Sequence, residues 1–372
     1  MEEYVYIDGK QYRRGYTTGS CATAAAKAAT YMLITKQPID NINIDTPKGI
    51  LLNIKIHNVK ITDDYVECSV QKDGGDDIDA THKMHIYARA EINNESLSNI
   101  EVCGGVGIGV ITKKGLSVEV GKAAINPVPM RMILNEVDKV KNTEKIKITI
   151  YAPRGEEVAK KTFNPRLGIM GGISIIGTTG IVEPMSDEGW KKSLSLELKM
   201  KKELGVDKII LVPGNHGEKF VQENLGLDMK HVVRTSNFIG YMLKEAQRFG
   251  YKKIFLVGHI GKYIKLSAGI FNTHSKIADA RNEILISNLA MMKAPYELLT
   301  KINECLTTDE AVEIINEYGY GEIYDLICDK CKLRVEQYLQ DEDIEVETMI
   351  FSMDKTLLGK SKNADSLVEV FR

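Results

Sequence analysis

The sequence predicts an α+β amino-terminal domain followed by an α/β domain with a mainly parallel, Rossmann-like sheet. Two observations support this. The first part of the chain combines one alanine-rich helical segment with several alternating, β-rich segments, whereas strand and helix candidates take turns from residue 145 onward. The length of 372 residues is that of about two domains. We therefore expect domains at residues 1–145 and 146–372.

In the first domain, residues 20–34 form the alanine-rich segment, and alanine has the highest helix propensity. Alternation of apolar and polar residues predicts β-structure in the segments that follow. The remaining elements expected here are strands within 42–61 and at 65–70, 85–92 and 116–120, a glycine-rich turn at 103–109, and a helix at 129–140 with proline at its start.

In the second domain, short runs rich in β-branched residues alternate with amphipathic segments, which favours crossover helices between parallel strands. The expected strands are 146–151, 173–176, 208–212, 231–233 and 253–257. Residues 275–339 are expected to be mostly helical, and 346–351 to be a late strand at the edge of the sheet.

Composition excludes several classes of protein. A hydrophobic fraction of 43%, a charged fraction of 27% and a net charge of −2 describe a water-soluble globular chain that has no overall field to attract nucleic acid. The start, MEEYVYIDGK, lacks the features of a signal peptide, and no apolar run reaches the length of a membrane span. We expect a cytoplasmic protein that binds neither nucleic acid nor membrane.

The six cysteines are dispersed and are expected to be reduced. Cys328 and Cys331 form one CxxC, but no second pair or nearby histidine completes a zinc site, so we interpret them as neighbours on a helix. No protein-bound metal is expected.

The segment GGISIIGTTGIVEPMS, residues 171–186, predicts a strand, a glycine-rich turn and a helix. Ligands of open α/β sheets bind just outside the carboxyl ends of the strands. The candidate contacts are therefore Gly177, Thr178, Thr179, Gly180 and Glu183. An ordinary tight connection is the alternative, because the turn is neither GxGxxG nor a P-loop.

The segment RRGYTTGSCATAAAKAAT, residues 13–30, places Thr17, Thr18 and Ser20 at the start of a helix. Free amides and the helix dipole there suit a carboxylate or phosphate, and Arg13 and Arg14 add positive charge. The loop is superficially similar to the phosphate cradle of small-molecule kinases. A simply capped helix is an equally good interpretation, and Cys21 has no adjacent base that would make it a nucleophile.

The segment DGGDDIDATH crowds acidic side chains around two glycines. Such acids repel one another unless a cation, amides or a shared proton offsets them, so one of them is expected to titrate unusually high. The candidates are Asp73, Asp76, Asp77, Asp79 and His82. The spacing misses the EF-hand pattern of a calcium loop, and a solvated acidic turn is the alternative.

Three polar segments, VPGNHG, TSNFIG and VGHIGK, each follow or adjoin an apolar strand of the second domain. They are expected at the same edge of a parallel sheet as the turn at 177–180. Their candidate ligand contacts are Gly214, Asn215, His216, Asn237, Gly258, His259, Gly261 and Lys262. NTHS, residues 272–275, is expected to cap a helix that begins near residue 276.

Together these motifs closely resemble the cobalt-precorrin-5B C1-methyltransferase family of anaerobic cobalamin biosynthesis, in order, from about residue 12 to 285. The segments that carry the resemblance are RRGYTTGSCATAAAKAA, DGGDDIDATH, GGVGIGVITKKGL, GKAAINPVPMRMI, GGISIIGTTGIVEPMS, VPGNHG, SNFIG and VGHIGKYIKLSAGIFNTHS. Lys83 departs from the family, which often has glycine after the histidine. Residues past 290 match weakly.

The resemblance implies methyl transfer from S-adenosylmethionine to C-1 of cobalt-precorrin-5B, giving cobalt-precorrin-6A and S-adenosylhomocysteine. Under this hypothesis the cofactor contacts are Gly177 to Gly180, Glu183, Gly214, Asn215, Gly258 and His259. The substrate contacts are Arg13, Arg14, Thr17, Thr18, Ser20, Arg131, Asn237 and Lys262, with the corrinoid in the interdomain cleft. The catalytic candidates are Asp73, Asp76, Asp77 and His82. A small-molecule kinase and a non-catalytic corrinoid carrier are the alternatives, and a homo-oligomer is left open.

Overall fold

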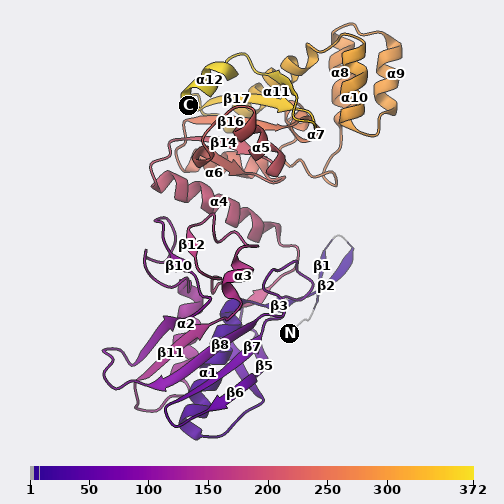
Figure 1. Ribbon diagram of the computed structural model, residues 1–372. Helices are drawn as coiled ribbons and strands as arrows, with labels where there is room; N and C mark the ends of the chain where they lie inside the picture. The colour runs from indigo at the N-terminus through magenta and orange to yellow at the C-terminus, as the bar shows by residue number, and fades with distance from the viewer. Residues whose placement is uncertain (1–3, 8) are drawn as a thin grey trace. The chain divides into compact units, whose positions relative to one another are not determined.

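The computed structural model describes residues 4–7 and 9–372 and divides into two compact units, Met1–Asp187 and Glu188–Arg372 (Figure 1). We call them the first and the second unit. Each has its own five-stranded sheet.

The sheet of the first unit has the order β6-β7-β8-β11-β9. Its strands are β6 (His57–Ile61), β7 (Tyr65–Gln71), β8 (His85–Ile92), β9 (Ile100–Gly104) and β11 (Ile146–Tyr151). β11 pairs antiparallel with β8 and parallel with β9. Short strands and one short helix complete the unit: β1 (Tyr4–Ile7), β2 (Lys10–Arg13), β3 (Gly15–Tyr16), β4 (Asn41–Asp45), β5 (Leu51–Lys55), β10 (Val110–Ile111), α3 (Gly155–Ala159), β12 (Ile169–Met170) and β13 (Ile181–Val182).

Helix α1 (Thr18–Thr35) lies across one face of this sheet, and α2 (Pro127–Asp138) packs along α1. Ala24, Ala25 and Ala28 of α1 are fully buried, because small side chains allow the helix to approach β7 and β8 closely. The helix predicted at 20–34 is thus confirmed, and it is almost entirely enclosed by the core of the unit.

The boundary predicted near residue 145 is wrong, because β11 is an interior strand of the first sheet. Two expected strands are also absent from the described part of the first unit. Residues 116–120 form no strand, and residues 173–176 make only the isolated pairings Ile108 with Ile173 and Ile125 with Ile175.

The sheet of the second unit has the order β15-β14-β16-β17-β18. Its strands are β14 (Lys208–Val212), β15 (Val232–Arg234), β16 (Lys253–His259), β17 (Glu345–Phe351) and β18 (Leu357–Lys360). The first four run parallel and β18 runs antiparallel to β17. Because β18 follows it, β17 is an interior strand and not the edge strand that the sequence suggested.

Helices follow the strands of this sheet, and α11 and α5 contact β17 and β16 respectively. The stacked rings of Phe220 in α5 and Phe351 in β17, 4.3 Å apart, belong to a core that α12 also covers. The helical elements are α4 (Asp187–Glu203), α5 (Asn215–Glu223), η1 (Met229–His231), α6 (Ile239–Arg248), α7 (Ile260–Tyr263), η2 (Ile264–Ala268), α8 (Arg281–Met291), α9 (Tyr296–Glu304), α10 (Thr308–Glu317), α11 (Ile323–Leu339) and α12 (Ala364–Phe371).

Across the sheet, the four parallel strands lie in the order β15, β14, β16, β17, so the second along the chain comes first and the first comes second. This is one of the common orders of doubly wound sheets, and the order reverses between β14 and β16. Ligands of such sheets bind at the carboxyl ends of the strands beside this reversal. The predicted alternation of parallel strands and crossover helices therefore holds for residues 208–259, where it positions a candidate site.

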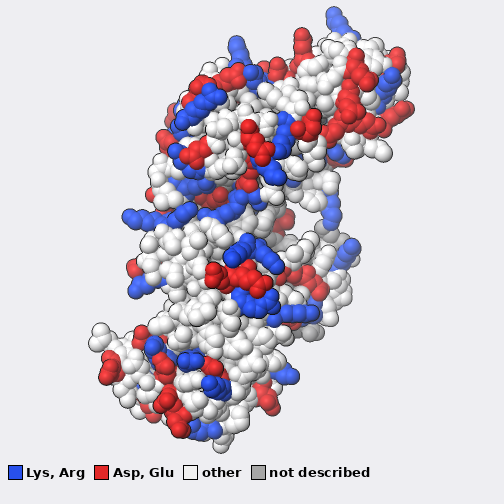
Figure 2. Space-filling model, viewed as in Figure 1, with Lys and Arg blue, Asp and Glu red and all other residues white. Residues whose placement is uncertain are grey.

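The charged surface is mixed. On the face that Figure 2 shows, basic and acidic side chains are interspersed, with acidic side chains gathered over α8 to α10. None of the described helices is both long and apolar enough to cross a membrane.

Replacing Gly75 by alanine is expected to destabilise the first unit strongly. Gly75 has φ 65°, and a Cβ there would lie 2.1 Å from the carbonyl oxygen of Arg13. Strain and overpacking together should lower the free energy of unfolding by about 2 to 5 kcal/mol. The control is Gly49→Ala, where φ is also positive but nothing lies within 4 Å. Equal losses in urea unfolding of the two variants would contradict the close approach.

Candidate functional site

The first turn of α1 is occupied by the protein's own backbone. The amide of Gly19 donates to the carbonyl of Ile176 at 2.9 Å, and the hydroxyl of Ser20 donates to the carbonyl of Gly180 at 2.7 Å. The hydroxyl of Thr18 accepts from the amide of Ile176 at 2.9 Å, and that of Thr17 caps the helix. Thr17, Thr18 and Ser20 are buried. The interpretation of this segment as an anion cradle is therefore wrong, and the kinase alternative loses its main support.

The glycines of the turn at 177–180 are required by this contact. Gly177 has φ 137°, and a Cβ on it would lie 2.3 Å from the hydroxyl oxygen of Thr17. Gly180 has φ 82°, and its Cβ would lie 2.8 Å from that of Thr46. The turn therefore belongs to the first unit. The prediction that it shares an edge with the parallel sheet of the second unit is wrong, because residues 173–176 are not a strand of that sheet.

The charges of the acidic loop, residues 73–82, are offset mainly by hydrogen bonds and ion pairs within the first unit. The guanidinium of Arg13 donates two hydrogen bonds to Asp73, at 2.6 and 2.7 Å, and the amide of Arg13 donates to Asp76 at 2.6 Å. The amide of Met185 donates to Asp77 at 3.0 Å, and the ring of His82 accepts from the amide of Gly74 at 3.1 Å. These contacts give the loop a structural role.

The ion pair of Asp79 with Lys72 is the most enclosed contact of this loop, since the Lys72 side chain is 2% exposed. Burial acts to raise the pKa of Asp79, but the charge and hydrogen bonds of Lys72 and Thr81 outweigh it and lower the pKa. Hydrogen bonds from Arg13 lower the pKa of Asp73. The expectation that an acid of this loop titrates unusually high is therefore wrong for both residues, because each has a basic partner.

The structure clarifies two residues that the sequence left ambiguous, Lys83 and Cys21. Lys83 has φ 62°, so it adopts the left-handed conformation that a glycine would favour there, and its amide still donates to the carbonyl of Lys72. Burial raises the pKa of Cys21 to about 12, so this cysteine is a neutral thiol near neutral pH. Cys21 therefore has no thiolate with which to attack a substrate.

Glu183 is held by two basic side chains. Lys48 donates a hydrogen bond to it, and the guanidinium of Arg14 lies 3.6 Å from its carboxylate. The hydrogen bond from Lys48 lowers the pKa of Glu183 below its usual value. Glu183 thus keeps its charge and joins the hairpin of β4 and β5 to the segment that contains β13.

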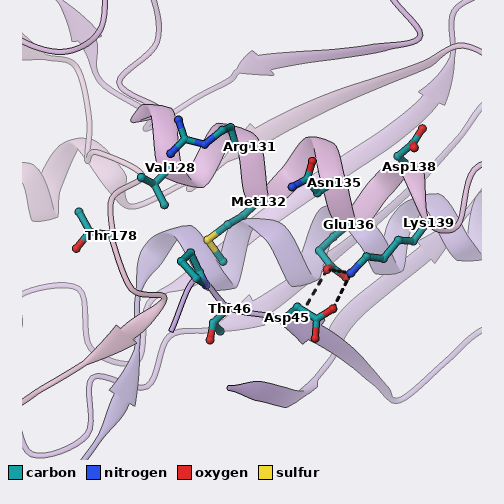
Figure 3. Close-up of a pocket in the computed structure, with 11 residues that line it drawn as sticks. Asp45, Thr46, Val128, Arg131, Met132, Asn135, Glu136, Asp138, Lys139 and Thr178 are labelled. Atoms are coloured by element: carbon teal, nitrogen blue, oxygen red, sulfur yellow. Dashed lines mark hydrogen bonds and ion pairs between the residues drawn. The ribbon is translucent and has the colours of Figure 1, made fainter. Parts of the chain in front are cut away.

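A pocket of about 660 Å³ opens in the first unit beside α2 (Figure 3). Its volume lies within the range of about 300 to 1,000 Å³ that is usual for small-molecule sites. It brings together Arg131 and Thr178, which the sequence proposed for different ligands. The lining is Asp45, Thr46, Pro47, Val128, Arg131, Met132, Asn135, Glu136, Asp138, Lys139 and Thr178.

One end of this pocket is a network around Glu136, whose side chain is 3% exposed. Lys27 lies 2.6 Å from its carboxylate, and Lys139 also contacts it. Lys139 lies 2.7 Å from Asp45 as well (Figure 3). At the other end, the structure records no hydrogen bond or ion pair of the Arg131 side chain within the described residues.

The carboxyl edge of the second sheet carries the other candidate contacts. Because β14, β15 and β16 are parallel, the residues that follow them meet at one edge. Gly214 and Asn215 follow β14, Asn237 follows β15, and His259 and Lys262 lie at the end of β16. The predicted convergence of these residues is confirmed for the second unit.

Several polar groups at this edge are already ordered. The Nδ1 of His259 accepts from the amide of Gly261 at 3.0 Å, which leaves the proton on Nε2, 3.3 Å from Asp309. Lys262 donates to the side chain of Asn237 at 2.9 Å. Burial, with the nearby charge of Lys265, lowers the pKa of Lys262. The edge therefore has a fixed arrangement of donors before any ligand binds.

The glycines of this edge differ in function. A Cβ on Gly258 would lie 2.8 Å from the ring of Tyr263, so the packing of this ring requires glycine there. Gly214 has nothing within 4 Å of a Cβ position, which leaves open space above the end of β14. The NTHS segment caps no helix at residue 276, because the next helix, α8, begins at Arg281.

Some residues at these sites could not be identified from the sequence. Asp309 lies in α10, far along the chain from His259, and Arg234 at the end of β15 is paired with Glu218 of α5. Asn135 and Glu136 of the pocket follow Arg131 on α2. Their spacing of four and five residues from Arg131 on a helix was the one signal in the sequence that could have placed them beside it. Cys328 and Cys331 are buried neighbours on α11, as expected, and the described residues contain no cluster that could hold a metal ion.

The polar strand ends of the parallel sheet in the second unit and the polar pocket in the first unit are places of the kind where proteins bind small molecules. Residues 5–184 match the family described as CbiD, and residues 272–362 match the family described as CbiD, C-terminal domain. Over its full length the chain is 65% identical to the cobalt-precorrin-5B C(1)-methyltransferase of Clostridioides difficile, which it covers completely.

The chain is also 51% identical to the enzyme of the same name from Listeria monocytogenes, with 100% of both chains covered. The solved cobalamin biosynthesis protein (cbiD) of Archaeoglobus fulgidus is 26% identical, with a TM-score of 0.39, over 75% of this chain and 88% of that one. The identities of 65% and 51% over the full length show that the chain belongs to the cobalt-precorrin-5B C1-methyltransferase family.

Removing the charge of Asp79 is expected to destabilise the first unit, because Lys72 is left buried without an ionised partner. Asp79→Asn should cost about 3 to 5 kcal/mol at neutral pH. Since the folded pKa of Asp79 is lowered, its stabilisation is present above the unfolded pKa and is lost as pH falls through the folded pKa. Urea unfolding of both proteins from pH 7 down to acid should therefore show their difference shrinking. A constant difference would contradict the ion pair.

Proposed function

We propose that this protein transfers a methyl group from S-adenosylmethionine to C-1 of cobalt-precorrin-5B, giving cobalt-precorrin-6A and S-adenosylhomocysteine. The observation that carries this proposal is the full-length identity of 65% to a relative with that name. The open strand ends of the second unit and the pocket of the first unit offer separate places for two ligands, as a group transfer between two substrates requires.

The proposed cofactor site is the carboxyl edge of the second sheet, at the reversal of strand order between β14 and β16. Gly214 leaves room for close approach of a ligand, and Asn215, His259 and Lys262 surround that space with polar groups. Lys262 is a suitable partner for the carboxylate of the methionine part, and His259 for a ribose hydroxyl. This proposal keeps Gly214, Asn215 and His259 of the predicted cofactor contacts and moves Lys262 from the predicted substrate contacts to the cofactor.

The chemistry asks mainly for positioning. The methyl group of a sulfonium is already electrophilic, so the protein has to align C-1 with the methyl–sulfur bond and exclude water. Such alignment can supply about 7 to 11 kcal/mol of the barrier. Fixed groups such as the His259 and Asp309 pair suit this role. Among the acids of the loop, Asp76 and Asp77 remain the candidates for direct contact, because each accepts one backbone hydrogen bond through one oxygen, whereas both oxygens of Asp73 are bound by the Arg13 guanidinium.

The direct test is incubation of the purified protein with methyl-labelled S-adenosylmethionine and cobalt-precorrin-5B, followed by location of the label. Label at C-1 of the corrinoid is expected. Label that stays in the cofactor would overturn the proposal, and corrinoid binding without cofactor binding would identify a carrier. In the same assay, an unchanged rate for Asp76→Asn would exclude a catalytic role of that charge.

Replacing Gly214 by leucine is expected to weaken cofactor binding without loss of stability. The new side chain has open space at the protein surface, so it should obstruct the ligand and spare the fold. We expect the Kd for S-adenosylmethionine, measured by calorimetry, to rise at least about tenfold, or roughly 1.4 kcal/mol.

The matched control for this variant is Gly321→Leu, another glycine of the second unit with no close neighbour, which precedes α11. Its Kd should equal that of the unchanged protein. Normal cofactor binding by Gly214→Leu would exclude the edge of the second sheet as the cofactor site.

A further inference from the structure

We infer that the pocket beside α2 is a recognition site for one carboxylate arm of the substrate, with Arg131 as the residue that selects it. This inference rests on the proposed function, because the tetrapyrrole substrate carries acetate and propionate side chains around its ring. One acetate or propionate side chain would enter the pocket beside α2 and bind the guanidinium of Arg131.

The other basic residues proposed for the substrate are already committed within their own unit. Arg13 is bound to Asp73 through both terminal nitrogens, and Arg14 faces Glu183 together with Lys48. Lys262 belongs to the second unit and donates to Asn237. Recruiting Arg13 or Arg14 would require an existing contact to break, and Lys262 is the residue proposed above for the cofactor carboxylate. Arg131 has no such recorded contact in the described chain, so its guanidinium is available without that cost.

The charges around the pocket balance except for Arg131. Glu136 is neutralised by Lys27 and Lys139, and Lys139 also meets Asp45. Asp138 lies 3.6 Å from Lys141. These three acids and three lysines cancel, and Arg131 then adds one positive charge. A single carboxylate entering the pocket would therefore meet one net positive charge and no uncompensated acid.

The lining also matches the two ends of an acid arm. Val128, Met132 and Pro47 supply apolar surface for methylene groups. Asn135, four residues after Arg131 on α2, and Thr178 add polar groups to the same lining (Figure 3). Guanidinium binds a carboxylate through two parallel hydrogen bonds, which fixes orientation as well as affinity. Thr178 sits in the turn that α1 holds through Gly180 and Ile176, so that hydroxyl is positioned by the core of the unit.

The test compares the unchanged protein with Arg131→Ala and Arg131→Lys, and with Arg154→Ala as the control. Arg154 is an exposed arginine of the first unit that pairs with Glu157 on α3 and does not line the pocket. The probes are cobyrinic acid, a stable corrinoid polycarboxylate, and its fully methyl-esterified form. Binding is followed by the corrinoid absorbance and needs no turnover.

We expect Arg131→Ala to raise the Kd for cobyrinic acid at least about tenfold, as for loss of a hydrogen bond to a charged group. Arg131→Lys should restore part of the affinity, because lysine returns the positive charge but cannot form the two parallel hydrogen bonds of a guanidinium. The ester should bind weakly and equally to all four proteins, and the Kd for S-adenosylmethionine should not change. The thermal midpoint serves as the check on folding.

The outcomes separate the inference from the proposed function. Equal cobyrinic acid binding by all variants, equal losses for acid and ester, or no binding by the unchanged protein would each overturn the carboxylate site. If Arg131-dependent binding is found but no methyl transfer occurs, the site stands and the proposed function fails. If methyl transfer occurs with the same KM in Arg131→Ala, the function stands and the site fails.

Discussion

The anchoring of residues 176–180 on the first turn of α1 is the constraint on which the first unit depends. A helix that begins inside a core must satisfy its leading amides, and here a distant backbone segment provides the acceptors. The same contact requires glycine at 177 and 180, directs Thr178 to the pocket, and brings β13 beside β3. Residues 176–180, which resemble a ligand-binding loop in sequence, are thereby fixed by α1 and contribute Thr178 to the lining of the pocket beside α2.

In the second unit, groups from separate segments are brought together by the topology of the sheet. This parallel sheet gathers polar groups at one edge, because parallel strands all end on the same side. The hydrogen bonds from Lys262 to Asn237 and between His259 and Asp309 then fix groups that arrive from separate loops. At both sites several charged groups are already paired with other groups of the protein. Those still available to a ligand are correspondingly few, which makes Arg131 and the space above Gly214 informative.

Regular elements with a local signal were predictable from the sequence. Residues 85–92, 146–151 and 208–212 were each predicted as strands with the bounds that the structure shows, because alternation and β-branched residues act within a single strand. The site was less predictable where its partners lie far along the chain. Neither the pairing of Arg13 with Asp73 nor the filling of the α1 turn by Ile176 and Gly180 leaves a local trace in sequence. The misplaced boundary has the same origin, since β11 joins a sheet whose strands all precede it.

The neighbouring strands β16 and β17 are separated along the chain by residues 260–344. At usual synthesis rates this interval lasts roughly 4 to 17 seconds on the ribosome. During that time the fully apolar run Ile254 to Val257 of a nascent chain has β14 on one side and lacks its second hydrogen-bonding neighbour, β17, on the other. A chain that ends before residue 345 therefore leaves β16 as an apolar edge strand with one unpaired side, which is the kind of edge that favours aggregation.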